Sequence, residues 1–313
     1  MLEILLMLAG LLGLWLGTEL VVNKAVKIAE YYNLSQLFIG IAILAVGTDL
    51  PEMVIAINAS VQNALHDVDT SGIIIGNAIG SSFTQISLVL GITGTMGYLT
   101  LTRRHLYEDG AMLIGTIILV FLLGYDTTIS RLDGIALLTV YAIYYFSQFY
   151  KERLGKKMKR KPSRSIKRDV VLLTVGVLVV VVTSELVVDN AISLAEKLHI
   201  RQSFVGILLI GLGTSLPELA LSINAIRKKA HGLSVGNLIG SNIFDLLVPV
   251  GLGALIAELH LEKRLLWFDL TVLLGLSLLV LFFFFKKKGL QPIEAIVLIG
   301  VFLVYAALKL MGA

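Results

Sequence analysis

The chain contains no cysteine and few charged residues. Of its 313 residues, 15% are Asp, Glu, Lys or Arg, while 57% are hydrophobic. The absence of cysteine excludes disulfides, thiolate metal sites and thiol nucleophiles. A soluble domain usually carries about a quarter charged residues, so this chain has too little polar surface to cover a soluble body. Composition therefore argues against a soluble enzyme, a nucleic-acid-binding protein and a disordered protein. It favours a polytopic helical membrane protein.

Long apolar runs divide the sequence into ten segments. A helix needs about 20 apolar residues to cross roughly 30 Å of hydrocarbon. We predict an all-α membrane protein with ten transmembrane helices, over residues 2–29, 35–62, 71–97, 106–124, 132–150, 170–196, 202–226, 232–257, 265–285 and 290–311. The polar stretch 151–169 separates the fifth helix from the sixth, and we predict that it is a basic cytoplasmic linker.

Two blocks of sequence occur twice, in the same order. Residues 19–59 align with 185–225 at an offset of 166, with 19 identities in 41 positions. The block GNAIGS at 76–81 matches GNLIGS at 236–241 at an offset of 160. Two shared blocks in one order indicate an internal duplication.

The duplication divides the chain into two halves of five helices each. The first half is 1–150, with its α-repeat at about 36–97, and the second is 170–313, with its α-repeat at about 202–257. Because five is odd, the second half enters the membrane in the opposite sense. This predicts an inverted-topology repeat, which is typical of secondary transporters whose sites lie near the bilayer midplane.

The basic residues predict how the chain is oriented. With the amino terminus outside, 18 of the 26 Lys and Arg lie on the inner side and 6 lie on the outer side. Cytoplasmic loops carry an excess of Lys and Arg. We therefore predict a multi-pass protein of the cell membrane with its amino terminus outside. Segment 151–168, which holds ten basic residues, is then cytoplasmic.

Two glutamates occupy equivalent positions inside apolar spans, in the repeated motif GT-x-LPE. Ionisable residues at membrane depth are costly and usually functional. Spans related by a twofold axis bring Glu52 and Glu218 together, where a cation relieves the repulsion of the two carboxylates. With neither Cys nor buried His on offer, oxygen ligands favour Ca²⁺ or Na⁺. The alternative is a packing kink whose Glu bonds a neighbouring helix, but the whole motif occurs twice.

A proline precedes each of these glutamates. Pro51 and Pro217 have no N–H and clash with the carbonyl four residues back. We expect a kink at each motif, with the carbonyls around 47–48 and 213–214 free to face an ion. Two hydroxyl side chains lie beside these carbonyls, those of Thr48 and Thr214.

The second repeated block supplies further oxygen atoms. Ser81 and Gln85 are four residues apart, as are Ser241 and Asp245, so each pair shares one face of a helix. These side chains are candidates for Na⁺ ligands or, at Asp245, for a protonatable gate. The glycines of the block are expected to serve close helix packing.

Both blocks resemble the α-repeats of the calcium/cation antiporter superfamily, and most of all its prokaryotic sodium/calcium exchangers. The resemblance covers the ten-span layout and implies exchange of Na⁺ for Ca²⁺ by alternating access. By motif position it implies that Glu52 and Glu218 hold Ca²⁺ with the Thr48 and Thr214 carbonyls, and share oxygens with Na⁺. It also implies a further set of Na⁺ ligands, namely Ser81, Ser215, Ser241 and Asp245.

The first repeat departs from the family pattern in two places. Asp49 stands where the family commonly has Ser, whereas the second repeat keeps Ser215. Gln85 ends the sequence SSFTQ, where the family commonly has SNIFN or SNIFD. The polar core therefore holds four carboxylates, on Asp49, Glu52, Glu218 and Asp245. We hypothesise that Asp49 or Asp245 is protonated in some transport states, because like charges and desolvation both favour the neutral form.

Proton/calcium antiport is the alternative closest to sodium/calcium antiport. Relatives that use protons typically carry GN-x-x-E, and here Gly80 and Gly240 occupy that acidic position, while Asp49 keeps the rival open. A cation channel is a third candidate function. Without a GxxxxGK[ST] loop, an HExxH motif or a nucleophile–base pair in the spans, we predict neither a primary pump nor an enzyme. We predict no cofactor and no nucleic acid, a monomer in the lipid bilayer, and Ca²⁺ and Na⁺ as substrates.

Overall fold

The computed structural model describes residues 2–66, 69–97, 99–154, 165–197, 211–287 and 289–311, which are mainly helical. The elements of the first half are α1 (Leu2–Tyr32), α2 (Gln36–Ile39), the π-helix η1 (Gly40–Leu44), α3 (Ala45–Thr48), α4 (Leu50–His66), α5 (Ser71–Thr84), the π-helix η2 (Gln85–Val89), α6 (Leu90–Met96), β1 (Leu99–Thr100), α7 (Arg103–Leu123), β2 (Thr128–Ile129) and α8 (Arg131–Leu154). The elements of the second half are α9 (Ser165–Lys197), α11 (Gly211–Thr214), α12 (Leu216–Arg227), α13 (His231–Ile256), β3 (Leu259–His260), the π-helix η4 (Leu265–Asp269), α14 (Leu270–Lys287), β4 (Gly289–Leu290) and α15 (Pro292–Leu310).

Several of these helices are long and apolar enough to cross a membrane. In the described part of the chain six helices meet this condition, and the bent pair Gln36–Thr48 with Leu50–Leu65 is a seventh candidate. The prediction of a multi-pass helical membrane protein is thus supported. Residues 202–210 of the predicted seventh span and 155–164 of the predicted linker lie outside the described residues. Helices α8 and α9 extend into the predicted linker from its two ends.

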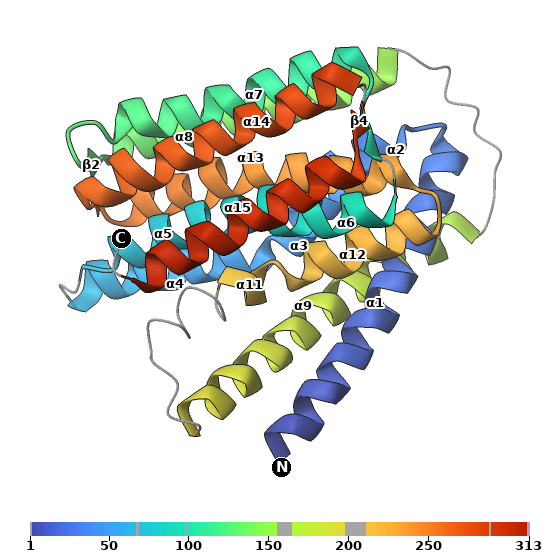
Figure 1. Ribbon diagram of the computed structural model, residues 1–313, viewed down its shortest axis with the longest axis horizontal. Coiled ribbons are helices and arrows are strands. Elements are labelled where there is room, and N and C mark those ends of the chain that lie inside the picture. The colour runs from blue at the N-terminus through green and yellow to red at the C-terminus, as the bar shows by residue number, and fades with distance from the viewer. Residues whose placement is uncertain are drawn as a thin grey trace.

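Helix α13 forms the centre of the body. It is buried along nearly its whole length and packs against α4, α5, α8 and the α2–η1 segment (Figure 1). Glycine allows the closest of these contacts. A Cβ on Gly40 would lie 2.7 Å from the backbone N of Asn237, and one on Gly240 would lie 2.8 Å from Cα of Ile41.

The expected role of the glycines in close packing is confirmed at Gly236 and Gly240, where a Cβ would collide with the Leu37 carbonyl oxygen and with Cα of Ile41, respectively. A Cβ on Gly76 or Gly80 meets no atom of the described residues within 4 Å, so close packing is not seen there.

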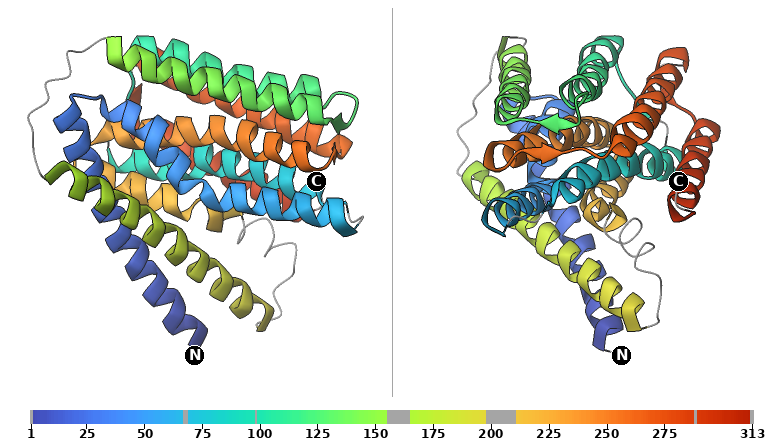
Figure 2. Two further views of the ribbon diagram at one scale, coloured as in Figure 1. Left: turned by 180° about the vertical axis from the view of Figure 1, so that it is seen from behind. Right: turned by 90° about the vertical axis from the view of Figure 1, so that its left-hand side faces the viewer.

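Helices α1 and α9 pack against one another and project from the rest of the body (Figure 2). They contact the core mainly through α12 and α11. The Asn224 amide on α12 donates to the Thr18 hydroxyl on α1 at 2.7 Å, in a buried position. The α1–α9 pair therefore joins the core over a limited surface that includes a specific polar contact.

Two short antiparallel strand pairs join the halves at opposite ends of the body (Figure 1). Strand β1 pairs with β4, and β2 pairs with β3. By the offset of the repeated GN block, β3 is the counterpart of β1, and β4 is the counterpart of β2. Each strand of the first half thus pairs with the counterpart of the other strand.

Candidate cation-binding site

The two GT-x-LPE motifs form helix breaks with the same backbone geometry. Asp49 separates α3 from α4 with φ −88° and ψ 12°, and Ser215 separates α11 from α12 with φ −90° and ψ 3°. Both residues lie in the sparsely populated bridge region, where many active-site residues are found. The first break bends the span by 43°, so the kink expected from Pro51 is present.

Three carboxylates converge beside the first break. Asp49, Glu52 and Asp245 each offer an oxygen, and these oxygens all lie within 4.8 Å of one another. All three side chains are fully buried, as is that of Glu218, whose carboxyl group lies near that of Asp49. Helix α13 brings Asp245 to the motif of the first repeat because α13 packs directly against α3 and α4.

A network of neutral polar side chains holds Asp245 in place. The Ser81 hydroxyl donates to Oδ2 of Asp245 at 2.9 Å, and the Gln85 amide donates to the same oxygen at 3.1 Å. Gln85 also donates to Ser81 at 3.0 Å, and Asn242 donates to Oε1 of Gln85 at 2.9 Å. Ser81 lies 3.4 Å from Oε1 of Glu52. Ser81 therefore connects the acids of the two halves.

The threonines of the two motifs lie near each other's glutamates. Thr214 lies near Glu52, and Thr48 lies near Glu218. The Thr48 hydroxyl itself donates to the Leu44 carbonyl at the end of η1, at 3.0 Å and within the same span. Each half thus places a threonine against the acid of the other half.

Many oxygens of this centre have no hydrogen-bond donor. Among the described residues, both carboxylate oxygens of Asp49 and of Glu218 are buried without a partner, as are Oε2 of Glu52 and Oδ1 of Asp245. The ion pairs of the described residues include none of these four acids. A buried carboxylate is strongly unfavourable unless it is paired, protonated or bound to a cation. The arrangement is suited to binding hard cations through oxygen ligands.

Known proteins resemble this chain over nearly its whole length. The family model described as "Sodium/calcium exchanger protein" matches residues 2–150 and 169–311. The chain belongs to this family. An uncharacterized membrane protein of Methanocaldococcus jannaschii is 32% identical to this exchanger-family chain over 97% of each chain. The sodium/calcium exchanger MaX1 of Methanosarcina acetivorans is 26% identical over 94% of each chain.

Solved structures of the sodium-calcium exchanger NCX_Mj have the same fold as this member of the family. A structure of NCX_Mj soaked with Na⁺ and Sr²⁺ superposes with a TM-score of 0.86 at 31% identity, over 98% of each chain. One soaked with Na⁺ and Ca²⁺ gives a TM-score of 0.85. The agreement extends over the whole length of both chains, so the exchanger fold is shared and is not confined to one repeat.

The ten residues predicted for the site are all buried: Thr48, Asp49, Glu52, Ser81, Gln85, Thr214, Ser215, Glu218, Ser241 and Asp245. The hydroxyl of Ser241 has no partner among the described residues. Two asparagines of this family member were not among the predicted ligands. Asn242 donates to Gln85, and Asn237 Oδ1 lies 3.4 Å from the Thr48 hydroxyl. Asn237 and its counterpart Asn77 belong to the repeated GN pair. The duplication could therefore have indicated Asn237, but not Asn242.

Gln85 is predicted to stabilise the fold through this network. Replacing Gln85 with Leu leaves Oδ2 of Asp245 with one donor fewer and removes the acceptor of Asn242. Because buried groups that lose their partners cost about 1–3 kcal/mol each, we expect Gln85→Leu to lower the unfolding free energy by that order. Thermal unfolding of the purified protein measures this, with Gln85→Asn as a polar comparison. Equal melting temperatures for Gln85→Leu and wild type would contradict the network.

Proposed function

We propose that this protein is a secondary antiporter that exports Ca²⁺ in exchange for Na⁺ by alternating access. The observation that carries the proposal is the convergence of Asp49, Glu52 and Asp245, with Glu218 beside them, in a buried centre of unpaired oxygens. Cations relieve the repulsion among these carboxylates and replace their lost hydration. Ca²⁺ and Na⁺ both accept carboxylate, hydroxyl and carbonyl oxygens.

Sharing the same carboxylates couples the two ions. A Ca²⁺ ion held by Glu52 and Glu218 occupies the oxygens that Na⁺ needs, so the two kinds of ion exclude each other. An empty centre carries several uncompensated charges in a water-poor environment, and moving it across the membrane is costly. The protein therefore changes between its outward-facing and inward-facing conformations with ions bound. Each outward movement of Ca²⁺ is followed by inward movement of Na⁺. A channel has no such requirement.

The proposed architecture is ten helices in two inverted repeats. It is supported by the matching backbone angles at Asp49 and Ser215 and by the exchange of strand partners between the halves. The Lys and Arg distribution supports an amino terminus outside and a cytoplasmic linker at 151–168. The α1–α9 pair, which joins the core over a limited surface, is the element proposed to slide during alternation.

Flux measurements on the full chain in proteoliposomes test the proposal. Vesicles are loaded with Na⁺ and diluted into Na⁺-free buffer containing radiolabelled Ca²⁺, at equal pH on both sides. We expect Ca²⁺ uptake above the level of electrochemical equilibrium, and no uptake in vesicles loaded with K⁺. Uptake driven by a pH gradient alone would overturn Na⁺ coupling. Uptake that never exceeds equilibrium would indicate a channel.

Proton/calcium antiport is the second candidate, and Asp49 favours it. Neither oxygen of this carboxyl has a donor among the described residues, and its group lies against Glu218. Exchange of a proton at this carboxyl would change the charge of the centre by one, which is what coupling of Ca²⁺ to H⁺ requires.

The substitution Asp49→Ser is predicted to change the stoichiometry of exchange. It restores the residue found at the equivalent position 215 and removes one charge from the centre. We expect a change in the charge moved per Ca²⁺ and a weaker dependence of transport on pH, because a titrating carboxyl is gone. Currents and fluxes recorded in parallel measure both quantities. Unchanged charge movement and pH dependence would show that Asp49 takes no part in coupling.

A further inference from the structure

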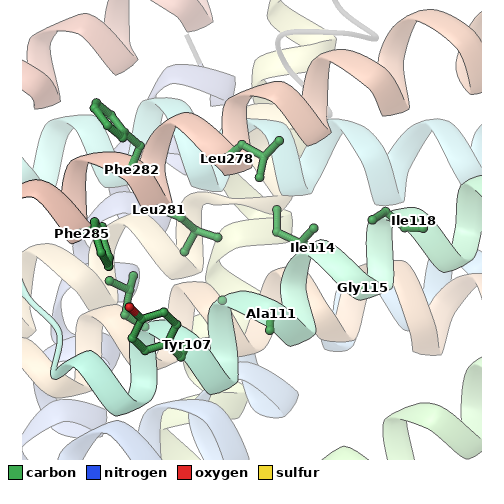
Figure 3. A pocket seen from close by; sticks show the side chains of 11 residues that line it. Tyr107, Ala111, Ile114, Gly115, Ile118, Leu278, Leu281, Phe282 and Phe285 are labelled. Carbon is green, nitrogen blue, oxygen red and sulfur yellow. The ribbon is translucent and has the colours of Figure 1, made fainter.

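An apolar groove of about 710 Å³ runs between α7 and α14 on the outside of the helical body (Figure 3). Tyr107, Gly115 and Ile118 lie on the α7 side, and Leu278 and Phe285 lie on the α14 side. The side chains of Tyr107, Ile118, Leu278 and Phe285 are between 41% and 57% exposed. The groove is thus an apolar hollow in the surface whose lining is partly exposed.

The groove has the length of one leaflet. Its lining on α7 extends from Leu106 to Ile118, which is about 18 Å at 1.5 Å per residue. Half the hydrocarbon thickness of a bilayer is about 15 Å. A transmembrane helix of a partner protein needs a contact surface that continues across both leaflets. An acyl chain extends through only one leaflet, which matches the length of this groove.

Two cations lie at one end of the groove. The Arg103 guanidinium lies 6.0 Å from the ring centre of Phe285, and the Lys286 ammonium lies 5.9 Å from that of Phe282. Both rings line the groove. Neither cation takes part in an ion pair with a described residue. Positive charge beside an apolar groove at a membrane interface is complementary to an anionic phospholipid.

The equivalent place in the other half differs in its aromatic packing and in one of its two charges. By the offset of the repeated GN block, Trp267 is the counterpart of Tyr107. Trp267 packs edge-on against Phe121 and Tyr125, with ring centres 5.2 and 5.8 Å apart. By the same offset, the counterpart of Arg103 is Lys263 and the counterpart of Lys286 is Asp126. The equivalent place therefore pairs one base with one acid, whereas the groove has two bases beside it. Two bases attract a phosphate more strongly than a base next to an acid.

From these observations we propose that the α7–α14 groove binds one anionic phospholipid, with an acyl chain against Gly115 and Leu278 and the phosphate between Arg103 and Lys286. Its leaflet is the cytoplasmic one if the proposed orientation holds. The lipid site itself is independent of the ion that drives transport.

Native mass spectrometry of the full chain tests the site. The protein is equilibrated with equal amounts of phosphatidylglycerol and phosphatidylcholine in mixed micelles. With about 1 kcal/mol for each of two basic residues, we expect roughly 30-fold preferential retention of one phosphatidylglycerol. The double variant Arg103→Gln with Lys286→Gln is expected to lose this preference. Equal retention of both lipids by wild type would overturn the proposal.

Filling the groove separates this site from general lipid adhesion. A Cβ on Gly115 meets nothing within 4 Å, so Gly115→Leu is expected to fold and to lose the bound lipid. Ala111→Leu is a second filling variant, on the same wall. The matched control is Gly275→Leu, because Gly275 is also open to a Cβ but is not part of the lining. Retention of the lipid in both filling variants would contradict the proposal. It would also be contradicted if the protein is a dimer that Gly115→Leu dissociates without loss of lipid, because the groove would then bind a second copy of the chain.

Discussion

Replacement of Glu52 or Glu218 by Gln is expected to lower Ca²⁺ uptake by a factor on the order of 100 or more. Each substitution keeps the size of the side chain and removes one charge from a fully buried centre. Loss of one partner from a buried, desolvated charge interaction costs about 2–5 kcal/mol, which corresponds to about 30-fold to several thousand-fold, and a factor on the order of 100 lies within this range. The effect is measured as the initial rate of radiolabelled Ca²⁺ uptake into vesicles loaded with Na⁺.

An exposed glutamate provides the control for these variants. Glu258 lies in the connection after α13 and is exposed, so Glu258→Gln is expected to transport at the wild-type rate. The variants must also be correctly folded, which thermal unfolding of the purified proteins checks. Transport that survives in both Glu52→Gln and Glu218→Gln would show that the cations cross elsewhere.

The substitution Gly40→Ala is expected to destabilise the protein by about 3 kcal/mol. A Cβ at this position would lie 2.7 Å from the carbonyl oxygen of Leu233 and 2.7 Å from the backbone N of Asn237. These neighbours are backbone atoms of α13, which cannot move aside as a flexible side chain does. The helix that carries the first break must separate from α13, and Asp245 then leaves the acids of that break.

Thermal unfolding measures the effect of Gly40→Ala, and Gly300→Ala is its matched control. Gly300 lies in α15, and a Cβ there meets nothing within 4 Å. Because Ala has a higher helix propensity than Gly, the control is expected to be at least as stable as wild type. Equal melting temperatures for the two variants would refute the close approach of η1 and α13.

Much of the candidate site follows from sequence because its signals are local or repeated. The motif GT-x-LPE contains the proline that bends the helix and the acid that lies beside the bend. The spacing of Ser81 and Gln85 predicts a shared helix face, and the two side chains are hydrogen-bonded. The assignment of ions to these side chains stays a prediction, as do the ten-helix count and the orientation.

Other features depend on contacts between distant segments, which no local pattern reports. Asn242 enters the network because α13 lies against η2, and the strand pairs join residues far apart in the chain. These contacts follow from the packing of the two halves, so they became visible only in the structure.

Two buried acids outside the site extend the duplication. Asp109 accepts from the Tyr144 hydroxyl, and its Oδ2 lies 3.0 Å from Nδ1 of His105. Its counterpart by the offset of the repeated GN block is Asp269, which accepts from Tyr305 and Lys309. The correspondence reaches α7 and η4, beyond the blocks that sequence identity reveals.

Competition between Na⁺ and Ca²⁺ for binding to the purified full-length protein tests most directly that one buried centre serves both ions. Ca²⁺ binding is titrated at constant pH and ionic strength while Na⁺ replaces K⁺. We expect the apparent Kd for Ca²⁺ to rise with Na⁺ more steeply than the first power of its concentration, because several Na⁺ displace one Ca²⁺. Glu52→Gln is expected to lose Ca²⁺ binding in both salts. A Kd that is indifferent to Na⁺ but rises on acidification would contradict the account and assign the exchange to protons.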